Sequence, residues 1–151
     1  MTLKEYIKTA NFTLHDQTEY VERWREMGFE MDPIPRAPLI ELDQEWWSEY
    51  SILEATWKAL HQIKEEGFKA ILIGGLSNVM AYAWFLAYHM RLRVIMARTP
   101  RKRTPDGKFV FELKGWTELM TPPDVLEETD RFRILKKAME FDQEVAQRKG
   151  E

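Results

Sequence analysis

Residues 71 to 103, which decide the fold, read ILIGGLSNVMAYAWFLAYHMRLRVIMARTPRKR. A continuous apolar run that ends at a Gly-Gly pair is typical of a strand buried on both faces of a sheet. The Ser-Asn pair that follows favours a helix start, and a second apolar strand, RVIMAR, precedes the basic residues at the end. A helix between two apolar strands predicts a right-handed crossover and a parallel strand pair.

The rest of the chain extends this unit in the order βαβαβαββα. Residues 99–107 predict a turn or mobile loop, in which Asp106-Gly107 is a hairpin signal. The expected fold is a three-layer, Rossmann-like α/β domain over residues 1–121 with a mostly parallel sheet. A C-terminal amphipathic helix is expected within residues 122–151, packed on this domain or on a partner. We expect strands over residues 3–12, 39–43, 68–74, 93–98 and 108–116, and helices over residues 13–29, 45–66, 77–90 and 124–150.

Composition excludes several classes of protein. The chain has 151 residues, 44% of them hydrophobic and 31% charged, as in an ordinary globular protein. Because it has no cysteine, it cannot form disulfides, thiolate zinc sites or a thiol nucleophile. The N-terminal residues lack the features of a signal peptide, and the longest apolar stretch, residues 79–90, is shorter than the roughly 20 residues that span a bilayer. We therefore expect a cytoplasmic protein that does not associate with membranes.

Charge is distributed unevenly along the chain. Residues 16–66 contain thirteen Asp or Glu and five Lys or Arg, a balance of −8, whereas residues 91–108 contain seven Lys or Arg and one Asp, a balance of +6. The basic block could receive an anion, but the acidic half disfavours wrapping by long nucleic acid. A compact anionic ligand is therefore favoured over duplex DNA.

Three loops should meet at one edge of the sheet, because ligands of parallel α/β sheets lie beyond the carboxyl ends of the strands. These loops are residues 11–15, 74–78 and 98–103. In the second loop, Gly74 and Gly75 permit close backbone approach, while Ser77 and Asn78 open a helix whose free N–H groups favour a phosphate. The spacing matches neither Walker A nor GxGxxG, and the same residues would also suit a plain strand-to-helix turn.

The other two loops offer basic and hydrogen-bonding side chains. Arg98 and Arg101 could bind a phosphate in bidentate fashion, or could belong to a solvated basic loop. Asn11 and Thr13 could hydrogen-bond a base or sugar, and His15 could act as a general acid or base, although N-capping of the next helix is a simpler role for Thr13. Since no histidine has a partner at metal-ligand spacing, we expect neither a metal ion nor a cofactor.

Four segments of the chain carry a resemblance to a known family. They are NFTLH at residues 11–15, ILIGGLSNVMAYAWFLAYH at 71–89, RVIMARTPRK at 93–102 and KFVFELKGWTEL at 108–119. Together they resemble the small CRISPR-associated ring-nuclease proteins, which are relatives of the CARF domains that bind cyclic oligoadenylates. This resemblance implies a homodimer that holds its ligand on the two-fold axis, between the loops after the first and third strands. Family members bind such rings in type III CRISPR defence, and several cut them without a metal by using the ligand's own 2′-hydroxyl.

The resemblance also implies a set of site residues. His15, Ser77 and Arg98 would be catalytic, with His15 able to move a proton while the other residues stabilise phosphate charge. In the family pattern a histidine directly follows the Asn-Phe-Ser/Thr triplet, whereas Leu14 intervenes here. Cleavage and mere binding of the ring therefore both stay open. The ligand-binding set would be Asn11, Thr13, Gly74, Gly75, Ser77, Asn78, Arg98 and Arg101.

Three other functions are compatible with the sequence. A non-catalytic sensor or sponge would hold the cyclic nucleotide without cutting it. A degenerate phosphoribosyltransferase-like protein would share the strand–helix–strand unit and its basic exit, but the paired acids that grip the ribose phosphate in that family are missing. An adaptor would use the helix after Pro123 as its functional surface.

Overall fold

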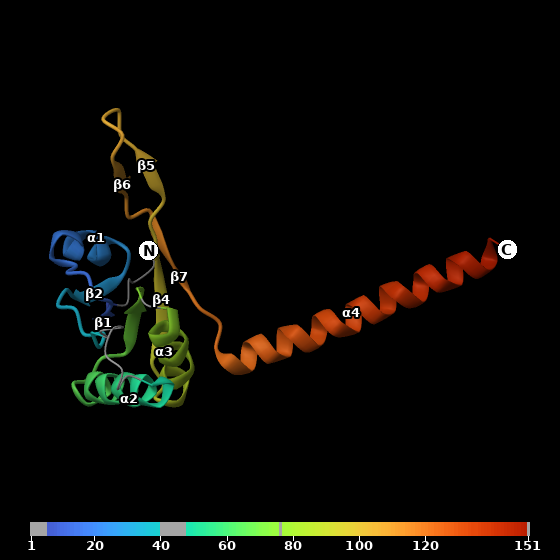
Figure 1. Cartoon of the computed structure of the whole chain (residues 1–151), viewed down its shortest axis with the longest axis horizontal. Helices are drawn as coiled ribbons and strands as arrows, with labels where there is room; N and C mark the ends of the chain where they lie inside the picture. Colours follow the sequence, from blue (N-terminus) through green and yellow to red (C-terminus); the bar gives the residue numbers. More distant parts are fainter. Residues whose placement is uncertain (1–5, 40–47, 76, 151) are drawn as a thin grey trace. The chain divides into compact units, whose positions relative to one another are not determined.

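The computed structural model describes residues 6–39, 48–75 and 77–150. The chain divides into two compact units, Met1–Leu119 and Met120–Glu151. The first unit is a mixed α/β domain, and the second contains one long helix (Figure 1). The expected division lay two residues further along, between residues 121 and 122.

A mostly parallel five-stranded sheet forms the centre of the first unit, as the sequence predicts. Its strand order is β2-β1-β3-β4-β7. β1 pairs in parallel with both β2 and β3, and β3 pairs in parallel with β4, whereas β7 runs antiparallel to β4 at the edge. The strands are β1 (Ile7–Phe12), β2 (Phe29–Asp32), β3 (Ala70–Ile73), β4 (Arg93–Arg98) and β7 (Gly115–Glu118).

Helices pack on both faces of the sheet. β3 shows this directly, because all four of its residues are buried and successive side chains point to opposite faces. Ile71 and Ile73 pack in one hydrophobic cluster with residues of α2 (Glu49–Glu65) and α3 (Ser77–His89). Leu72 packs in a second cluster with Trp24, which lies on α1 (Val21–Glu26).

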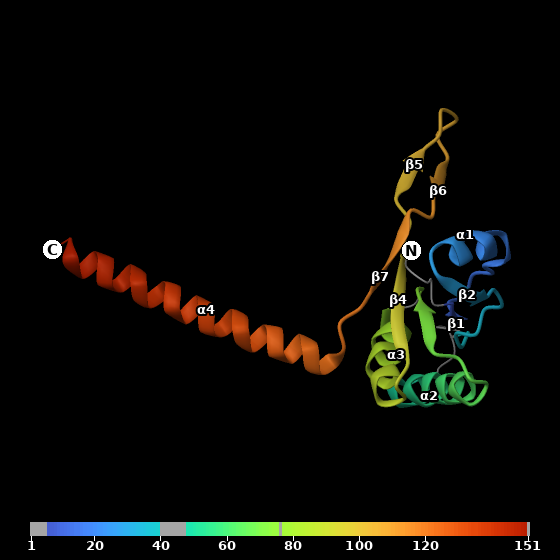
Figure 2. The same ribbon diagram turned by 180° about the vertical axis from the view of Figure 1, so that it is seen from behind.

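A second, two-stranded sheet consists of β5 (Arg101–Arg103) and β6 (Phe109–Phe111), which we call the ribbon. It extends beyond the ends of β4 and β7, as both ribbon views show (Figures 1 and 2). The turn is closed by the Thr104 N–H, which donates to the Lys108 carbonyl at 2.8 Å, and Gly107 adopts a φ of 83°. The Asp-Gly hairpin signal is thus confirmed.

The expected loop over residues 99–107 and the expected single strand over residues 108–116 were wrong. β5 lies inside the first segment, and the second is divided between β6 and β7. The division arises because the chain pairs with β5 up to Phe111 and then with β4 from Gly115 onward. β5 was not predicted because it consists of Arg and Lys. Charged residues are usual in loops, but they are also tolerated in an exposed strand pair.

The segment around β2 also differs from expectation. The first helix was expected over residues 13–29, but only η1 (Thr18–Tyr20) and α1 are helical, and the end of that segment begins β2. Buried Phe29 and Met31 alternate with exposed Glu30, which is a strand pattern. The expected strand over residues 39–43 lies almost wholly outside the described residues, as does the start of the helix expected over 45–66.

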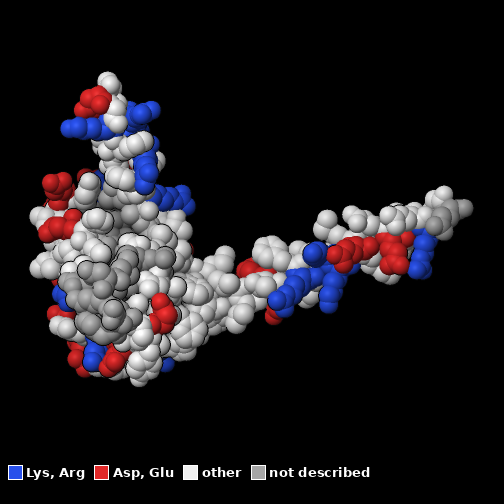
Figure 3. Space-filling view, in the orientation of Figure 1, with Lys and Arg blue, Asp and Glu red and all other residues white. Residues whose placement is uncertain are grey.

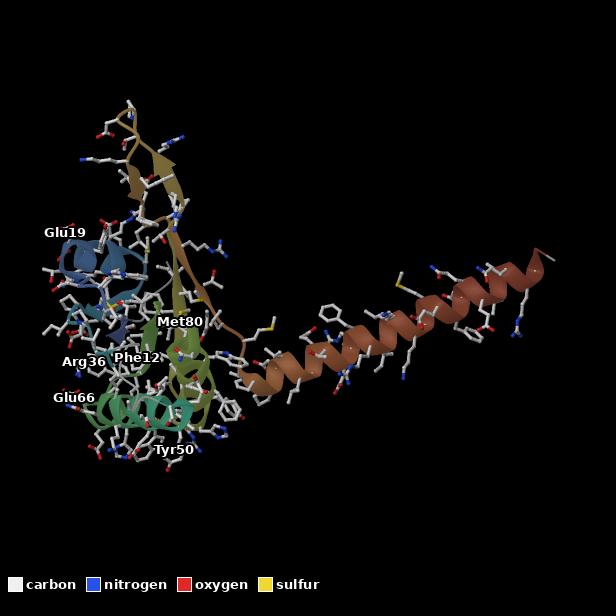
Figure 4. The ribbon with its side chains drawn as sticks, in the orientation of Figure 1. Phe12, Glu19, Arg36, Tyr50, Glu66 and Met80 are labelled. Atoms are coloured by element: carbon white, nitrogen blue, oxygen red, sulfur yellow. The ribbon has the colours of Figure 1, made fainter. Side chains whose placement is uncertain are left out.

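Arg36 anchors the proline-rich segment that follows β2. Its guanidinium forms ion pairs with Asp32, at 3.0 Å, and with Glu66 beside the end of α2 (Figure 4). It also lies over the ring of Phe68, 4.7 Å from the centroid. The backbone N–H of Arg36 donates to the Asn11 carbonyl at 2.9 Å, so this segment supports the end of β1.

The second unit contains α4 (Pro122–Lys149), close to the helix expected over residues 124–150. Thr121 and Asp124 form a capping box, in which each side chain accepts a hydrogen bond from the other's backbone N–H at 3.4 Å. Among the apolar residues of this helix, Phe132, Leu135 and Met139 are more than half exposed. Within the described part of the chain, no helix is both long and apolar enough to cross a membrane.

Candidate functional site

A cavity of about 490 Å³ lies at the carboxyl ends of β1, β3 and β4. The loops after these three strands meet there, as the parallel topology predicts. Thr13, His15, Gly74 and Gly75, all predicted site residues, line the cavity. The full lining is Thr13, His15, Asp16, Gln17, Tyr20, Leu72, Ile73, Gly74, Gly75, Met96, Ala97, Thr99, Phe111 and Leu113.

Asn11 organises the loop after β1 and does not line this cavity. Its side chain is fully buried, and its amide donates to the carbonyls of His15 at 2.7 Å and of Pro33 at 2.8 Å. Its Oδ1 accepts the hydroxyl of Thr13 at 2.7 Å. With every hydrogen-bonding group of the amide engaged inside the protein, Asn11 positions Thr13 and His15 instead of offering a free group to a ligand.

Thr13 and His15 are the predicted residues that reach the cavity from this loop. The Thr13 hydroxyl accepts the backbone N–H of His15 at 3.1 Å, which fixes the turn around Leu14. The His15 side chain is exposed. No hydrogen bond orients its imidazole within the described residues, so the ring is free to meet a bound molecule.

Gly74 and Gly75 shape the cavity from the β3 side. A Cβ on Gly74 would stand 3.4 Å from the methyl group of Thr13, so glycine lets the two loops lie against each other. Gly75 has a φ of 107°, a conformation that favours glycine. Asn78 accepts the N–H of Val79 at 2.9 Å and is absent from the cavity lining. Ser77 is the first residue of α3, and its side chain lies outside what the structure describes.

The predicted basic residues lie beside the cavity and not within its lining. Arg98 donates through Nε to the hydroxyl of Thr117 on β7 at 2.7 Å. Arg101 lies on β5 with its guanidinium over the ring of Phe111, 5.4 Å from the centroid. Phe111 does line the cavity, so the ribbon adjoins it through this ring.

Sequence reasoning missed four lining residues with useful chemistry. Asp16, Gln17 and Tyr20 belong to the turn and short helix after β1, where a continuous helix was expected. The Asp16 carboxylate accepts the hydroxyl and backbone N–H of Thr18, and these hydrogen bonds hold its pKa below the ordinary value. An Asp two residues before a Thr is a turn signal that could have revealed this segment. Phe111 is the fourth of these residues, and it lies on the ribbon, which the sequence did not predict.

The lining favours a flat, mostly apolar group over a bare phosphate. Most of the lining surface is apolar, and among the described residues that form the cavity there is no Lys or Arg. Asp16 also places a negative charge there. A nucleobase would suit these surroundings, whereas the phosphates of the same nucleotide would be better placed near Arg98 and Arg101. Within the described ranges, no group of three His, Asp or Glu is arranged to hold a metal ion.

No family model matches the sequence, and no curated protein matches it.

Proposed function

We propose that this chain binds cyclic oligoadenylate, the messenger of type III CRISPR defence, and opens the ring without a metal ion. The cavity at the carboxyl ends of three parallel strands carries this proposal, because the loops after β1 and β3 both line it. The mostly parallel sheet with helices on both faces supports a Rossmann-like, CARF-like assignment.

An adenine would occupy the cavity, and the phosphodiesters would lie at its edge. Gln17 and Thr99 offer hydrogen-bonding side chains for the base, while Leu72 and Phe111 offer apolar contact. Arg98 and Arg101 supply positive charge beside the cavity. A ring with several adenines is larger than this cavity, so a homodimer would share it.

Ring opening would proceed by transfer of the phosphodiester to the neighbouring hydroxyl. The ribose 2′-oxygen attacks the adjacent phosphorus and loses its proton, and the bond from phosphorus to the 5′-oxygen breaks. The 5′-oxygen takes up a proton, which leaves a linear strand with a 2′,3′-cyclic phosphate. His15, which is exposed at the cavity, would take or give one of these protons. The protein would otherwise act by holding the 2′-oxygen in line with the leaving oxygen.

Chromatography after incubation with cyclic tri-, tetra- and hexa-adenylate in EDTA tests the proposal. We expect linear products from at least one ring size, and a loss of roughly 10²- to 10⁴-fold in rate for His15→Ala. His61→Ala is the matched control, because His61 lies on α2, stacked on Trp57, and does not line the cavity. Failure to bind any ring size would refute both binding and cleavage.

A non-catalytic sensor is the second candidate. It is favoured by Leu14, which separates His15 from Thr13, and by the lack of any described hydrogen bond that would orient the imidazole. Tight binding of a ring that stays intact in the same incubation would select the sensor. Equal rates for the wild type and His15→Ala would instead leave cleavage in place and remove His15 from it.

A further inference from the structure

One face of the ribbon carries two arginines and two phenylalanines in register. Arg101 pairs with Phe111 across the two strands, and Arg103 pairs with Phe109. Because side chains alternate along a strand, these four residues share one face, while Lys102 and Val110 point to the other. We call the first of these the Arg–Phe face.

The cations on the two faces differ in their partners. On the Arg–Phe face, the guanidiniums of Arg101 and Arg103 lie 5.4 and 5.9 Å from the ring centroids of Phe111 and Phe109. Neither arginine has an acidic partner among the described residues. On the other face, Lys102 is paired with Glu112 at 2.9 Å. The Arg–Phe face therefore keeps its positive charge available to an anion.

The aromatic rings on this face are also open to contact. Phe109 is 59% exposed and Phe111 is 51% exposed. Lys and Arg side chains gather on the ribbon in the space-filling view (Figure 3). Surfaces that combine cations with exposed aromatic rings bind single-stranded nucleic acids, since phosphates pair with the cations and bases stack on the rings.

The Arg–Phe face adjoins the cavity, because Phe111 belongs to both. A cavity of about 490 Å³ is near the lower end of the range for small-molecule sites and suits one compact group. An adenylate of several nucleotides must continue outside it. The ribbon provides the adjoining surface with the charge and the rings to hold that continuation.

We propose that the Arg–Phe face binds the part of an adenylate strand that lies outside the cavity. Arg101 and Arg103 pair with its phosphates, and Phe109 stacks on one of its bases. This assignment rests on the proposed function for the identity of the ligand, and it adds a second binding site to the cavity. An anionic lipid surface is the other occupant that exposed Phe and Arg could suit, and the test includes it.

Binding of two adenylates to the full-length protein separates the two sites. AMP can fill the cavity alone, whereas fluorescein-labelled linear hexa-adenylate can also reach the ribbon. For Phe109→Ala we expect hexa-adenylate to bind roughly 5- to 150-fold more weakly, the equivalent of one lost stacking contact. For Arg101→Ala/Arg103→Ala the plot of log affinity against log salt should become shallower by about 1.4. AMP affinity should stay within about twofold in Phe109→Ala, because Phe109 does not line the cavity.

Lys102→Ala and Val110→Ala are matched controls, because they change the same strands on the opposite face. The affinity of both controls for hexa-adenylate should be closer to that of the wild type than the affinity of the Arg–Phe variants is. Circular dichroism and a thermal melt check that each variant is folded.

The outcomes distinguish failure of this inference from failure of the proposed function. Unchanged hexa-adenylate binding in the folded Arg–Phe variants, with AMP still bound, would overturn the ribbon site and leave the cavity assignment. If hexa-adenylate binds the wild type and Phe109→Ala weakens it, while no cyclic adenylate is bound, the ribbon site would stand and the proposed function would fail. A wild type that binds no hexa-adenylate would overturn the ribbon site. Sedimentation with phosphatidylserine vesicles that is lost in the Arg–Phe variants, while hexa-adenylate binding is unchanged, would assign the face to lipid instead.

Discussion

The central sheet and the ribbon use similar apolar sequences for opposite purposes. β3, with the sequence AILI, has all four residues buried between β1 and β4 and between two layers of helices. β6, with the sequence FVF, has all three residues exposed, and so does its partner β5. Apolar residues on a strand therefore do not define a core by themselves. The number of neighbouring strands and the presence of helices on the faces decide whether they are buried.

This difference separates the part of the chain that stabilises the fold from the part that is available for binding. A two-stranded hairpin is only marginally stable alone. Phe109 and Phe111 are exposed to water, so they do not form a hydrophobic core that would stabilise the ribbon. Exposed aromatic patches of this kind mark contact surfaces. Stability should therefore depend on the sheet, and binding on the ribbon.

The largest difference in stability is expected between Phe12 and Phe109. Phe12 ends β1 and is 1% exposed, so Phe12→Ala should lower the free energy of unfolding by about 3–5 kcal/mol. Phe109→Ala removes the same ring from a site that is 59% exposed and should cost within about 0.5 kcal/mol. Urea unfolding followed by circular dichroism measures both. A cost above about 2 kcal/mol for Phe109→Ala would show that the ribbon stabilises the domain, contrary to this expectation.

A smaller loss is expected at Asn11, which links the sheet to the candidate site. Asn11→Ala would leave the carbonyl of Pro33 without its amide partner and weaken the support of the His15 carbonyl, at a cost of about 1–3 kcal/mol. AMP affinity should fall as well, because the loop that presents Thr13 and His15 loses its support. Asn78→Ala is the control, since its described hydrogen bond is local and only partly buried. Equal stability of Asn11→Ala and the wild type would contradict the role given to Asn11.

The central part of the fold could be predicted because its signals are local. β4 begins and ends at the expected residues, Arg93 and Arg98, and β3 lies inside the expected apolar run. A strand buried on both faces needs continuous apolar residues, and such runs are visible in the sequence. β2 was missed because its alternation is short and is followed at once by prolines. The ribbon was missed because Arg101, Lys102 and Arg103 pair with a strand beyond the turn, which composition does not reveal.

The candidate site could be predicted as a place but only partly as a set of side chains. The meeting of three loops follows from parallel strands, and Thr13, His15, Gly74 and Gly75 line the cavity as expected. Which side chains enter it depends on burial and hydrogen bonding within the folded chain. Asn11 turns inward to hold its own loop, and Arg98 turns toward Thr117 on the neighbouring strand. Neither direction follows from the sequence pattern alone.

The smallest effect concerns the opposite face of the ribbon, where Glu112 lies between Lys102 and Lys114, each at 2.9 Å. Hydrogen bonds from Lys102, the larger cause, and from Lys114 lower the pKa of Glu112 from its ordinary 4.5 to about 2. Because the pKa is lower in the folded chain, any stability from this carboxylate is fully present above pH 4.5 and is lost as the pH falls toward 2. In Lys102→Ala the carboxyl carbon of Glu112 should therefore titrate at a higher pH by NMR, closer to 4.5, while hexa-adenylate binding at neutral pH changes little. An unshifted titration would mean that the lysine on this face is not held by Glu112. The two faces of the ribbon would then not differ in available charge, and the distinction between the paired lysine and the open arginines would fail.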